Sequence, residues 1–303
     1  MSIEQEKPSS TPLAAKRVGK GKAFGTFGEL LQGHLLEHNS DFLVTLPIAR
    51  YSYATFTSKP ASAAITTFPQ QKQKSQLLAR LLLEYYHLPP GGNLVISSEL
   101  PIGKGLASSS ADLVATARAI EMCFEITIPL GMLQRFMATI EPTDGVMYPG
   151  VVSFYHRRVQ LHALLGSLPP LTVVSIDEGG ELDTIQFNRL PRTFTRADKQ
   201  EYHALLDTLS TAVRRQDLQV IGQIATRSAL LNQKLNPKRT LNDLIAICQE
   251  VDGLGVVVAH SGTCLGLLLS PRDQRYADQL RAARRNLSGL TETVAIYHTL
   301  CFR

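Results

Sequence analysis

The segment best suited to chemistry is the stretch PIGKGLASSSA at residues 101–111. Gly103 and Gly105 allow the backbone to turn its N–H groups towards a ligand. A helix is expected from Ser108 onward, and it directs the positive end of its dipole and its unpaired N–H donors at the same point. The pattern fits an anion site that suits a polyphosphate, and from these residues alone it fits a plain loop before a serine-capped helix equally well. Lys104 would add a positive charge, and a serine hydroxyl would join an oxygen shell around Mg²⁺.

Two carboxylates follow in the segment EPTDG at residues 141–145. Phosphoryl transfer needs mainly positioning and charge neutralisation. An anion cradle, a metal-binding carboxylate and a carboxylate beside the nucleophile are its minimum set, and the family resemblance given below implies these two carboxylate roles for Glu141 and Asp144. The same residues also fit turn chemistry, because Asp before Gly marks a turn and Glu before Pro marks a helix end. From these residues alone, both interpretations stay open.

A rival signature is His34-Leu-Leu-Glu37-His38, which has the H-x-x-E-H spacing of inverted zinc peptidases. That chemistry needs both histidines on one helical face, a third ligand and a glutamate base. Gly33 precedes the pattern and Asn-Ser-Asp follows it at residues 39–41, which leaves too few residues for a helix. Histidines in a loop are therefore favoured over a metallopeptidase.

The elements that must position these residues alternate irregularly between strands and helices. Clusters of β-branched and aromatic residues predict strands at 23–29, 42–46, 51–57, 93–99, 151–155, 159–163, 171–176, 255–259, 264–269 and 293–300. Apolar residues at helical spacing predict helices at 76–86, 108–124, 130–140, 196–215, 218–231, 239–251 and 272–286. The serines at 108–110 stand where helix caps belong. Because regular β-α-β alternation is missing, the fold class is α+β.

The length of 303 residues favours two compact domains. Gly-Ser-Leu-Pro-Pro at 166–170 is the best candidate boundary, because two prolines end regular structure there. The expected division is a flexible basic tail at 1–22, an N-terminal domain at 23–168 and a C-terminal domain at 169–303, and the family resemblance given below implies that the N-terminal domain binds ATP. His260 to Thr263 separates two apolar strands as a tight turn, and its glycine and hydroxyls would let it close over a substrate or nucleotide.

Composition excludes several classes of protein. The longest apolar stretch, residues 254–269, is interrupted by polar side chains and is shorter than the run of about 18 that crosses a bilayer. The N-terminus lacks the apolar region of a secretory signal, which predicts a cytoplasmic protein. Of the net charge of +5, the tail holds five basic against two acidic residues. A nucleic-acid partner is not expected, since such proteins carry the charge on a folded face. The four cysteines form no C-x-x-C pair and are expected to be small buried hydrophobes.

Three segments together carry a family resemblance. PIGKGLASSSA resembles the motif P-x-x-x-G-L-G-S-S-A-A of the GHMP kinase superfamily, which includes galactokinase, homoserine kinase, mevalonate kinase and phosphomevalonate kinase. EPTDG resembles the segment that carries the family's carboxylates, and VAHSGTCLG at 258–266 resembles its C-terminal glycine motif. The resemblance implies a ribosomal-protein-S5-like N-terminal domain and a ferredoxin-like α/β sandwich at the C-terminus. The site would lie in the cleft between them, where pockets are favoured.

A fourth segment is more specific. GTFGELLQG at 25–33, with EPTD and AHSGT, resembles the L-threonine kinase branch of that superfamily, linked to cobalamin synthesis and propanediol utilisation. The implied reaction converts ATP and L-threonine to ADP and O-phospho-L-threonine, with Mg²⁺ as the metal. The implied partner is thus a small amino acid, without nucleic acid or membrane, in a protein that can be a homodimer. L-serine, homoserine or an amino alcohol stay open as acceptors, and a non-catalytic binding protein and the zinc enzyme stay open as other classes.

The resemblance also implies roles residue by residue. The ATP phosphates would lie against the loop and first turn formed by Gly103, Lys104, Gly105, Leu106, Ala107, Ser108, Ser109 and Ser110. Ser109 and Glu141 would approach Mg²⁺, and Asp144 would lie beside the acceptor hydroxyl as general base or as its orienting group. The residues expected on the acceptor side are Glu29, Gln32, Thr143, Ser261, Gly262 and Thr263.

Two positions depart from the family pattern. Ala107 stands where the family has Gly, so a positive φ there would cost about 1 kcal/mol or more. Glu29 stands where many relatives carry Lys or Arg. It is therefore expected to bind a substrate ammonium group rather than a phosphate, which suits an amino-acid acceptor.

Overall fold

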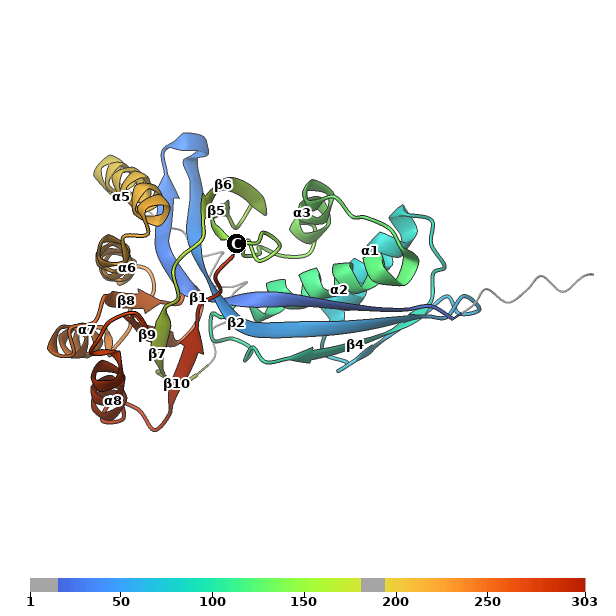
Figure 1. Ribbon diagram of the computed structural model, residues 1–303. Coiled ribbons are helices and arrows are strands. Elements are labelled where there is room, and N and C mark those ends of the chain that lie inside the picture. The colour runs from blue at the N-terminus through green and yellow to red at the C-terminus, as the bar shows by residue number, and fades with distance from the viewer. Residues whose placement is uncertain (1–15, 181–193, 303) are drawn as a thin grey trace, which may run out of the picture.

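Two long strands, β1 (Val18–Leu35) and β2 (Ser40–Ser58), form the antiparallel hairpin around which the rest of the chain is arranged. The computed structural model describes residues 16–180 and 194–302 (Figure 1). In that part of the chain, ten strands form one sheet with a main order of β10-β7-β9-β8-β1-β2-β4-β3. The hairpin therefore belongs to both halves of the molecule.

The first half of the chain covers one face of its strands with helices. β3 (Ile65–Phe68) pairs in parallel with β4 (Gly92–Ser98), and α1 (Gln73–Tyr85) connects them. α2 (Ser108–Phe124) lies on β1 and β2, and α3 (Leu130–Ala138) follows it beside α1 (Figure 1). β5 (Val151–Tyr155) pairs with β2 and with β6 (Gln160–Gly166).

Close packing of α2 against β1 depends on two glycines. A Cβ atom at Gly19 would lie 2.1 Å from the Ala119 carbonyl oxygen, and one at Gly21 would lie 2.2 Å from that of Ala115. Any side chain at either position would push the helix away from the strand. The glycines therefore fix how close α2 lies to the sheet, and with it the place of its N-terminus.

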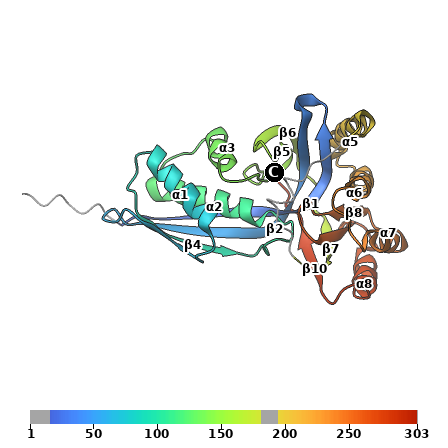
Figure 2. The same cartoon turned by 180° about the vertical axis from the view of Figure 1, so that it is seen from behind.

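The second half of the chain is a four-stranded antiparallel sheet backed by helices. Its strands are β7 (Thr172–Asp177), β8 (Gly255–Val258), β9 (Cys264–Leu269) and β10 (Val294–His298). Its helices are α5 (Arg196–Arg215), α6 (Leu218–Asn232), α7 (Leu241–Glu250) and α8 (Tyr276–Leu287). Figure 2, seen from behind, shows these helices together on the outer side of the sheet.

The two halves meet at an irregularity in β1. The register of β1 against β2 shifts between Thr26 and Glu29 and again between Glu29 and Leu31. Gly28 takes a positive φ of 52° inside this bulge, a conformation that glycine adopts without strain. Glu29 then pairs with Val258 of β8. A bulge re-aims side chains, and this one places Glu29 where both halves of the sheet meet.

Most predicted elements are present within a few residues of their expected ends, and α5 has the predicted bounds. Two expectations were wrong, and one strand was missed. β1 begins at Val18, so residues 18–22 belong to a strand rather than to the tail, while residues 1–15 lie outside the described residues. The strands expected at 42–46 and 51–57 are parts of β2, since pairing with β1 carries the backbone past Pro47. β3 was not predicted, because four residues carry too little periodicity.

The expected domain boundary at residues 166–170 connects β6 to β7. Side chains from both sides of it, among them Leu168, Leu209 and Leu268, belong to one hydrophobic core. A second core lies between the C-terminal sheet and α7 and α8. The division into two domains stays a prediction.

Two further features concern the described residues. No helix there is both long and apolar enough to cross a membrane. The thiols of Cys123, Cys248 and Cys264 are buried, as expected for small hydrophobes, whereas Cys301 is exposed.

Candidate active site

A cleft of about 640 Å³ opens where the loop before α2, the start of α1 and the segment at 141–144 meet. The residues predicted for the site that line it are Glu29, Gly103, Gly105, Leu106, Ala107, Ser108, Ser109, Ser110, Glu141, Thr143, Asp144 and Ser261. Four other predicted residues do not line it, namely Gln32, Lys104, Gly262 and Thr263. The structure therefore brings the loop and the carboxylates together at one place.

The loop before α2 has the backbone geometry of an anion cradle. Gly103, Gly105 and Ala107 take positive φ angles of 73°, 79° and 57°. Alternation of left-handed and right-handed residues turns successive N–H groups towards one point. Ala107 is the N-cap of α2 and adopts the left-handed conformation that the family glycine would take, at a cost of about 1 to 2 kcal/mol.

The serines of the first turn of α2 do not cap the helix, contrary to the sequence prediction. No side chain caps the helix N-terminus. Instead, Ser109 Oγ donates a hydrogen bond to Glu141 Oε1. Ser110 Oγ accepts a hydrogen bond of 3.1 Å from the Asp144 backbone N–H and lies 3.5 Å from Asp144 Oδ2. The hydroxyls thus hold the two carboxylates in front of the helix, and its N–H donors are left for a ligand.

Glu29 and Thr143 are two buried polar residues in the lining of the cleft. The Glu29 side chain is 4% exposed and that of Thr143 is 2% exposed. Within the described residues, Glu29 Oε2 and Thr143 Oγ1 have no hydrogen-bond partner. Buried polar atoms are nearly always paired, so two unpaired ones facing a cleft indicate a polar ligand.

Burial and neighbouring negative charges raise the pKa of two carboxylates in this region. Burial, followed by the charge of Asp144, raises the pKa of Glu29 well above its ordinary value, and a hydrogen bond from the His260 backbone opposes this. Desolvation and the charge of Glu141 raise the pKa of Asp144 to about 6, against the hydrogen bond of Ser110. Two acids that resist ionisation at one cleft favour a cationic group or a proton between them.

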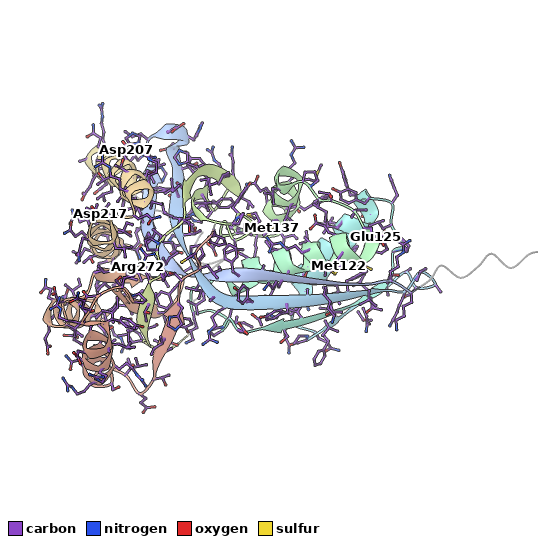
Figure 3. The ribbon with its side chains drawn as sticks, in the orientation of Figure 1. Met122, Glu125, Met137, Asp207, Asp217 and Arg272 are labelled. Atoms are coloured by element: carbon purple, nitrogen blue, oxygen red, sulfur yellow. The ribbon has the colours of Figure 1, made fainter. Side chains whose placement is uncertain are left out.

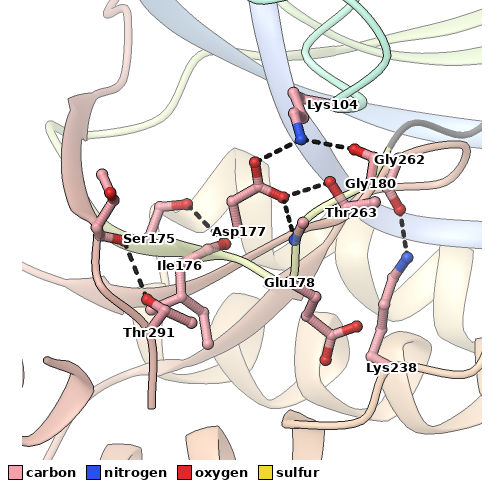
Figure 4. A network of polar contacts seen from close by, with 12 residues as sticks. Lys104, Ser175, Ile176, Asp177, Glu178, Gly180, Lys238, Gly262, Thr263 and Thr291 are labelled. Carbon is pink, nitrogen blue, oxygen red and sulfur yellow. Dashed lines mark hydrogen bonds and ion pairs between the residues drawn. The ribbon is translucent and has the colours of Figure 1, made fainter. Parts of the chain in front are cut away.

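Lys104 and Thr263 join the loop to the second half of the chain instead of lining the cleft (Figure 4). Lys104 Nζ lies 2.7 Å from Asp177 Oδ2 at the end of β7, and it donates a hydrogen bond of 2.7 Å to the Gly180 carbonyl. Asp177 Oδ1 accepts a hydrogen bond from Thr263 Oγ1. The charge of Lys104 therefore pairs with Asp177, and this contact positions the loop.

The turn at residues 260–263 is held from several sides. Asn236 Nδ2 donates to the His260 carbonyl at 3.0 Å, and Lys238 Nζ donates to the Gly262 carbonyl. Burial lowers the pKa of Lys238. Gln32 Oε1 lies 2.6 Å from His260 Nδ1, which explains why the Gln32 side chain faces the turn rather than the cleft. Side chains from β1 and from the segment after α6 thus hold this turn in place.

Gly262 sets the spacing between this turn and the loop. A Cβ atom there would lie 2.2 Å from the Lys104 carbonyl carbon and 2.3 Å from the Gly105 nitrogen. We expect Gly262→Ala to displace the loop, lower the free energy of unfolding by about 1 to 3 kcal/mol and weaken ADP binding on the order of tenfold. Thermal unfolding and calorimetric titration with ADP measure both effects.

Gly131→Ala in α3 is the matched control, because a Cβ atom there would meet no atom within 4 Å. It should keep the affinity for ADP and gain up to about 1 kcal/mol of stability. A Gly262→Ala protein with unchanged affinity would show that the turn does not position the loop.

Sequence reasoning missed four titratable residues that line the cleft, namely Lys72, Lys74, Asp112 and His156. The available signal for the two lysines was the sequence Lys-Gln-Lys at the start of a helix. Cations are unfavourable at a helix N-terminus, so two of them there indicate another role. His156 follows β5 and lies 4.7 Å from His260 between ring centroids. No local pattern marks His156 or Asp112.

The H-x-x-E-H pattern does not form the helix that a zinc peptidase needs. His34 belongs to β1, whereas Glu37 and His38 lie in a short 3-10 turn. His34 Nδ1 lies 2.6 Å from Asp41 Oδ1. In the described part of the chain, no group of three or more His, Cys, Asp or Glu side chains is arranged to hold a metal ion.

A second, smaller hollow of about 370 Å³ lies at α5 and α6, with Asp207 and Asp217 in its lining (Figure 3). Asp217 accepts a hydrogen bond of 3.1 Å from the Val220 backbone N–H as the cap of α6. Asp207 lies 3.6 Å from His203 one turn earlier. These carboxylates have structural partners, so the larger cleft is the candidate site.

The donor set of the larger cleft fits Mg²⁺ together with a polyphosphate. Ser109 and Glu141 offer a hydroxyl and a carboxylate in direct contact, and both supply oxygen. Mg²⁺ in phosphate-transferring sites is held by one or two such protein oxygens, with phosphate and water completing the shell. The uncapped N-terminus of α2 would take the phosphates.

Comparison with known proteins agrees with this geometry. Residues 74–150 match the family described as GHMP kinases N terminal domain. The L-threonine kinase of Citrobacter freundii is 29% identical over 84% of this chain and 87% of that protein. The L-threonine kinase of Salmonella typhimurium is 28% identical, with 85% of each chain covered.

Solved structures share the fold. Homoserine kinase from Cytophaga hutchinsonii superposes with a TM-score of 0.72 at 14% identity, covering 99% of this chain and 98% of that one. Mevalonate kinase of L. major in complex with R-mevalonate gives a TM-score of 0.68 at 17% identity, covering 98% and 99%. The predicted α+β fold is thereby confirmed as the fold of these kinases, and residues 74–150 match the N-terminal domain of the GHMP kinases.

Proposed function

We propose that this protein transfers the γ-phosphoryl group of ATP to the hydroxyl group of a small amino acid, with L-threonine as the acceptor. The observation that carries the proposal is the pairing of two side chains of α2 with two carboxylates in one cleft. Ser109 contacts Glu141, and Ser110 contacts Asp144. An uncapped helix N-terminus, a metal-type oxygen pair and a carboxylate with a raised pKa are the parts that phosphoryl transfer needs.

Each group then has a task in the reaction. The N–H groups of residues 103–109 would hold the phosphate chain, and Ser109 and Glu141 would hold Mg²⁺, which would supply neutralisation of phosphate charge. Asp144 accepts the proton of the acceptor hydroxyl. The hydroxyl oxygen forms a bond to the γ-phosphorus, and the bond from that phosphorus to the bridging oxygen breaks. The products are a phosphate ester, ADP and a proton on Asp144 that passes to water.

Recognition of an amino acid rests on Glu29. The ammonium group of the acceptor would lie against its unpaired carboxylate oxygen, and Thr143 Oγ1 would bind another polar atom of the same molecule. A buried carboxylate without a cation is costly, and the ammonium group removes that cost. This explains why a family member with an amino-acid acceptor carries Glu at this position.

The proposal is tested by measuring ADP release from Mg-ATP in a coupled assay over a panel of hydroxyl compounds. The panel contains L-threonine, L-serine, L-homoserine and an amino alcohol, and mass spectrometry identifies the phosphorylated product. We expect L-threonine to give the highest kcat/KM, with one phosphate added per molecule. Preference for another member would reassign the acceptor within the same reaction, and no transfer to any of them would refute the proposal.

Other predictions from the sequence accompany this proposal. The cytoplasmic location, the absence of membrane and nucleic-acid partners, the possible homodimer and the link to cobalamin synthesis stay predictions. The roles of Gln32, Ser261, Gly262 and Thr263 on the acceptor side also stay predictions. We propose that Gln32, Gly262 and Thr263 affect acceptor binding indirectly, because they position the turn at residues 260–263.

A further inference from the structure

Glu141 has a cationic partner that the proposed reaction does not yet use. Lys74, the second residue of α1, places its Nζ atom in contact with Glu141 Oε2. The other carboxylate oxygen, Oε1, accepts the hydrogen bond from Ser109. Both oxygens of the proposed metal carboxylate are therefore occupied by donors of this chain, and one of the donors carries a full positive charge.

Lys74 is held less firmly than its neighbour Lys72. Lys72 Nζ lies 2.5 Å from Asp112 Oδ2, and its side chain is 15% exposed. The opposite oxygen of Asp112 accepts a hydrogen bond of 2.5 Å from Ser52, which anchors that pair inside the protein. The Lys74 side chain is 43% exposed, whereas that of Glu141 is only 6% exposed. Of the two lysines in the cleft, Lys74 is the one with room to leave its partner.

The contact between Lys74 and Glu141 has a consequence for metal binding. A divalent cation at this site would bind the carboxylate oxygens of Glu141, which Lys74 and Ser109 now contact. The positive charges of the cation and of Lys74 would repel each other at such short range. Lysine has a long flexible stem and binds phosphate as a point charge. The loop of residues 103–110, where the phosphates would lie, lines the same cleft as Lys74.

We propose that Lys74 is an exchangeable counter-ion. It neutralises Glu141 while the cleft holds no metal ion, leaves that carboxylate when a divalent cation binds there, and then binds a phosphate of the nucleotide. This inference rests on the proposed function. If Lys74 exchanges partners in this way, metal and nucleotide bind cooperatively. The metal displaces Lys74 from Glu141, and the nucleotide phosphate then binds the displaced lysine.

The test is the variant Lys74→Met, which keeps the length and the apolar stem and removes the charge. Binding of Mn²⁺ to the nucleotide-free protein is followed by the electron paramagnetic resonance signal of the free ion. Binding of ADP in EDTA is followed by calorimetry. We expect Lys74→Met to bind Mn²⁺ about three- to tenfold more tightly and metal-free ADP about three- to tenfold more weakly than the unmodified protein.

Matched variants locate the effect. Lys234→Met removes an equally charged side chain whose Nζ atom lies 3.3 Å from Asp198, with 71% exposure, and should change neither affinity. Lys74→Arg should behave like the unmodified protein. Glu141→Gln should abolish the tight Mn²⁺ site, and adding Lys74→Met to it should then have no effect on Mn²⁺, as a double-mutant cycle requires.

Unchanged or weaker Mn²⁺ binding in Lys74→Met would overturn the counter-ion role, and unchanged ADP binding would overturn the phosphate role. Both measurements are made without an acceptor and without turnover. Failure of phosphoryl transfer across the acceptor panel, with these affinities as expected, would instead refute the proposed function alone.

Discussion

Replacing Asp144 by Asn is expected to lower kcat about 10²- to 10⁴-fold while the affinity for ADP stays within about twofold of the unmodified protein. A positioned general base contributes a factor of this size, and Asn cannot take the proton of the acceptor hydroxyl. The first turn of α2 and the loop before it are left intact, so nucleotide binding is preserved. Steady-state kinetics and calorimetry with ADP give the two values.

The pH dependence of kcat, compared between the unmodified protein and Asp144→Asn, shows whether Asp144 is a general base or only orients the acceptor hydroxyl. The pKa of Asp144 is about 6, so its carboxylate is present above that pH and is lost below it. At saturating L-threonine, kcat of the unmodified protein should fall as pH decreases through about 6. The residual kcat of Asp144→Asn should lack this decline. A decline retained in full by the variant would show that another group titrates.

As pH rises, the free energy of unfolding should decrease while kcat increases. The folded pKa of Asp144 lies above the ordinary value of 3.8, so the folded state binds this proton more tightly than the unfolded state does. Unfolding free energy therefore falls as pH rises from about 4 to about 6 and stays reduced above that. Asp144→Asn should gain about 1 to 3 kcal/mol at pH 8 and almost nothing at pH 3.5. Asp207→Asn, at a side chain 73% exposed, is the control and should show neither effect.

Replacing Glu29 by Gln is expected to raise KM for L-threonine about 10²-fold or more, with a smaller change in kcat. Removal of one partner from a buried ion pair costs about 3 to 5 kcal/mol, and Gln keeps the shape of the side chain without its charge. Because burial raises the pKa of Glu29, its carboxylate forms increasingly as pH rises. KM of the unmodified protein should therefore fall with rising pH, and that of Glu29→Gln should not. Kinetics over a pH series measure both.

The ammonium contact itself is tested with 3-hydroxybutyrate, which has the hydroxyl and carboxylate of threonine and no amino group. It should be a poor acceptor for both proteins, with KM values that Glu29→Gln leaves almost unchanged. Glu250→Gln at the exposed end of α7 is the matched control. Equal losses for L-threonine and 3-hydroxybutyrate would show that Glu29 acts on something other than the amino group.

Local sequence predicted those parts of the site whose residues are neighbours along the chain. Glycines at 103 and 105 and the helix from Ser108 follow from backbone preferences within a few residues. The structure has these elements at the expected positions. The expected capping of the helix by serines was wrong, because a helix cap and a carboxylate partner look the same in sequence. Ser109 and Glu141 are 32 positions apart, and their contact depends on the packing of α2.

The acceptor side shows the same limit. The motif around Glu29 was evident, yet its isolation from water and its proximity to Asp144 depend on the bulge in β1 and on its pairing with Val258. Lys104 looked like a phosphate ligand because it stands in the loop. Its partner, Asp177, belongs to the other half of the chain, and only the folded structure brings them within 2.7 Å.

By itself, then, the sequence determined the helices, most strands, the family resemblance and the short segments that carry it. These depend on side-chain periodicity and on turn preferences, which act over a few residues. Tertiary structure alone decided the long β1–β2 hairpin, the unpaired atoms of Glu29 and Thr143 and the contact of Lys74 with Glu141. Each of these joins residues far apart in the chain, where burial and charge are set by packing rather than by neighbours in sequence.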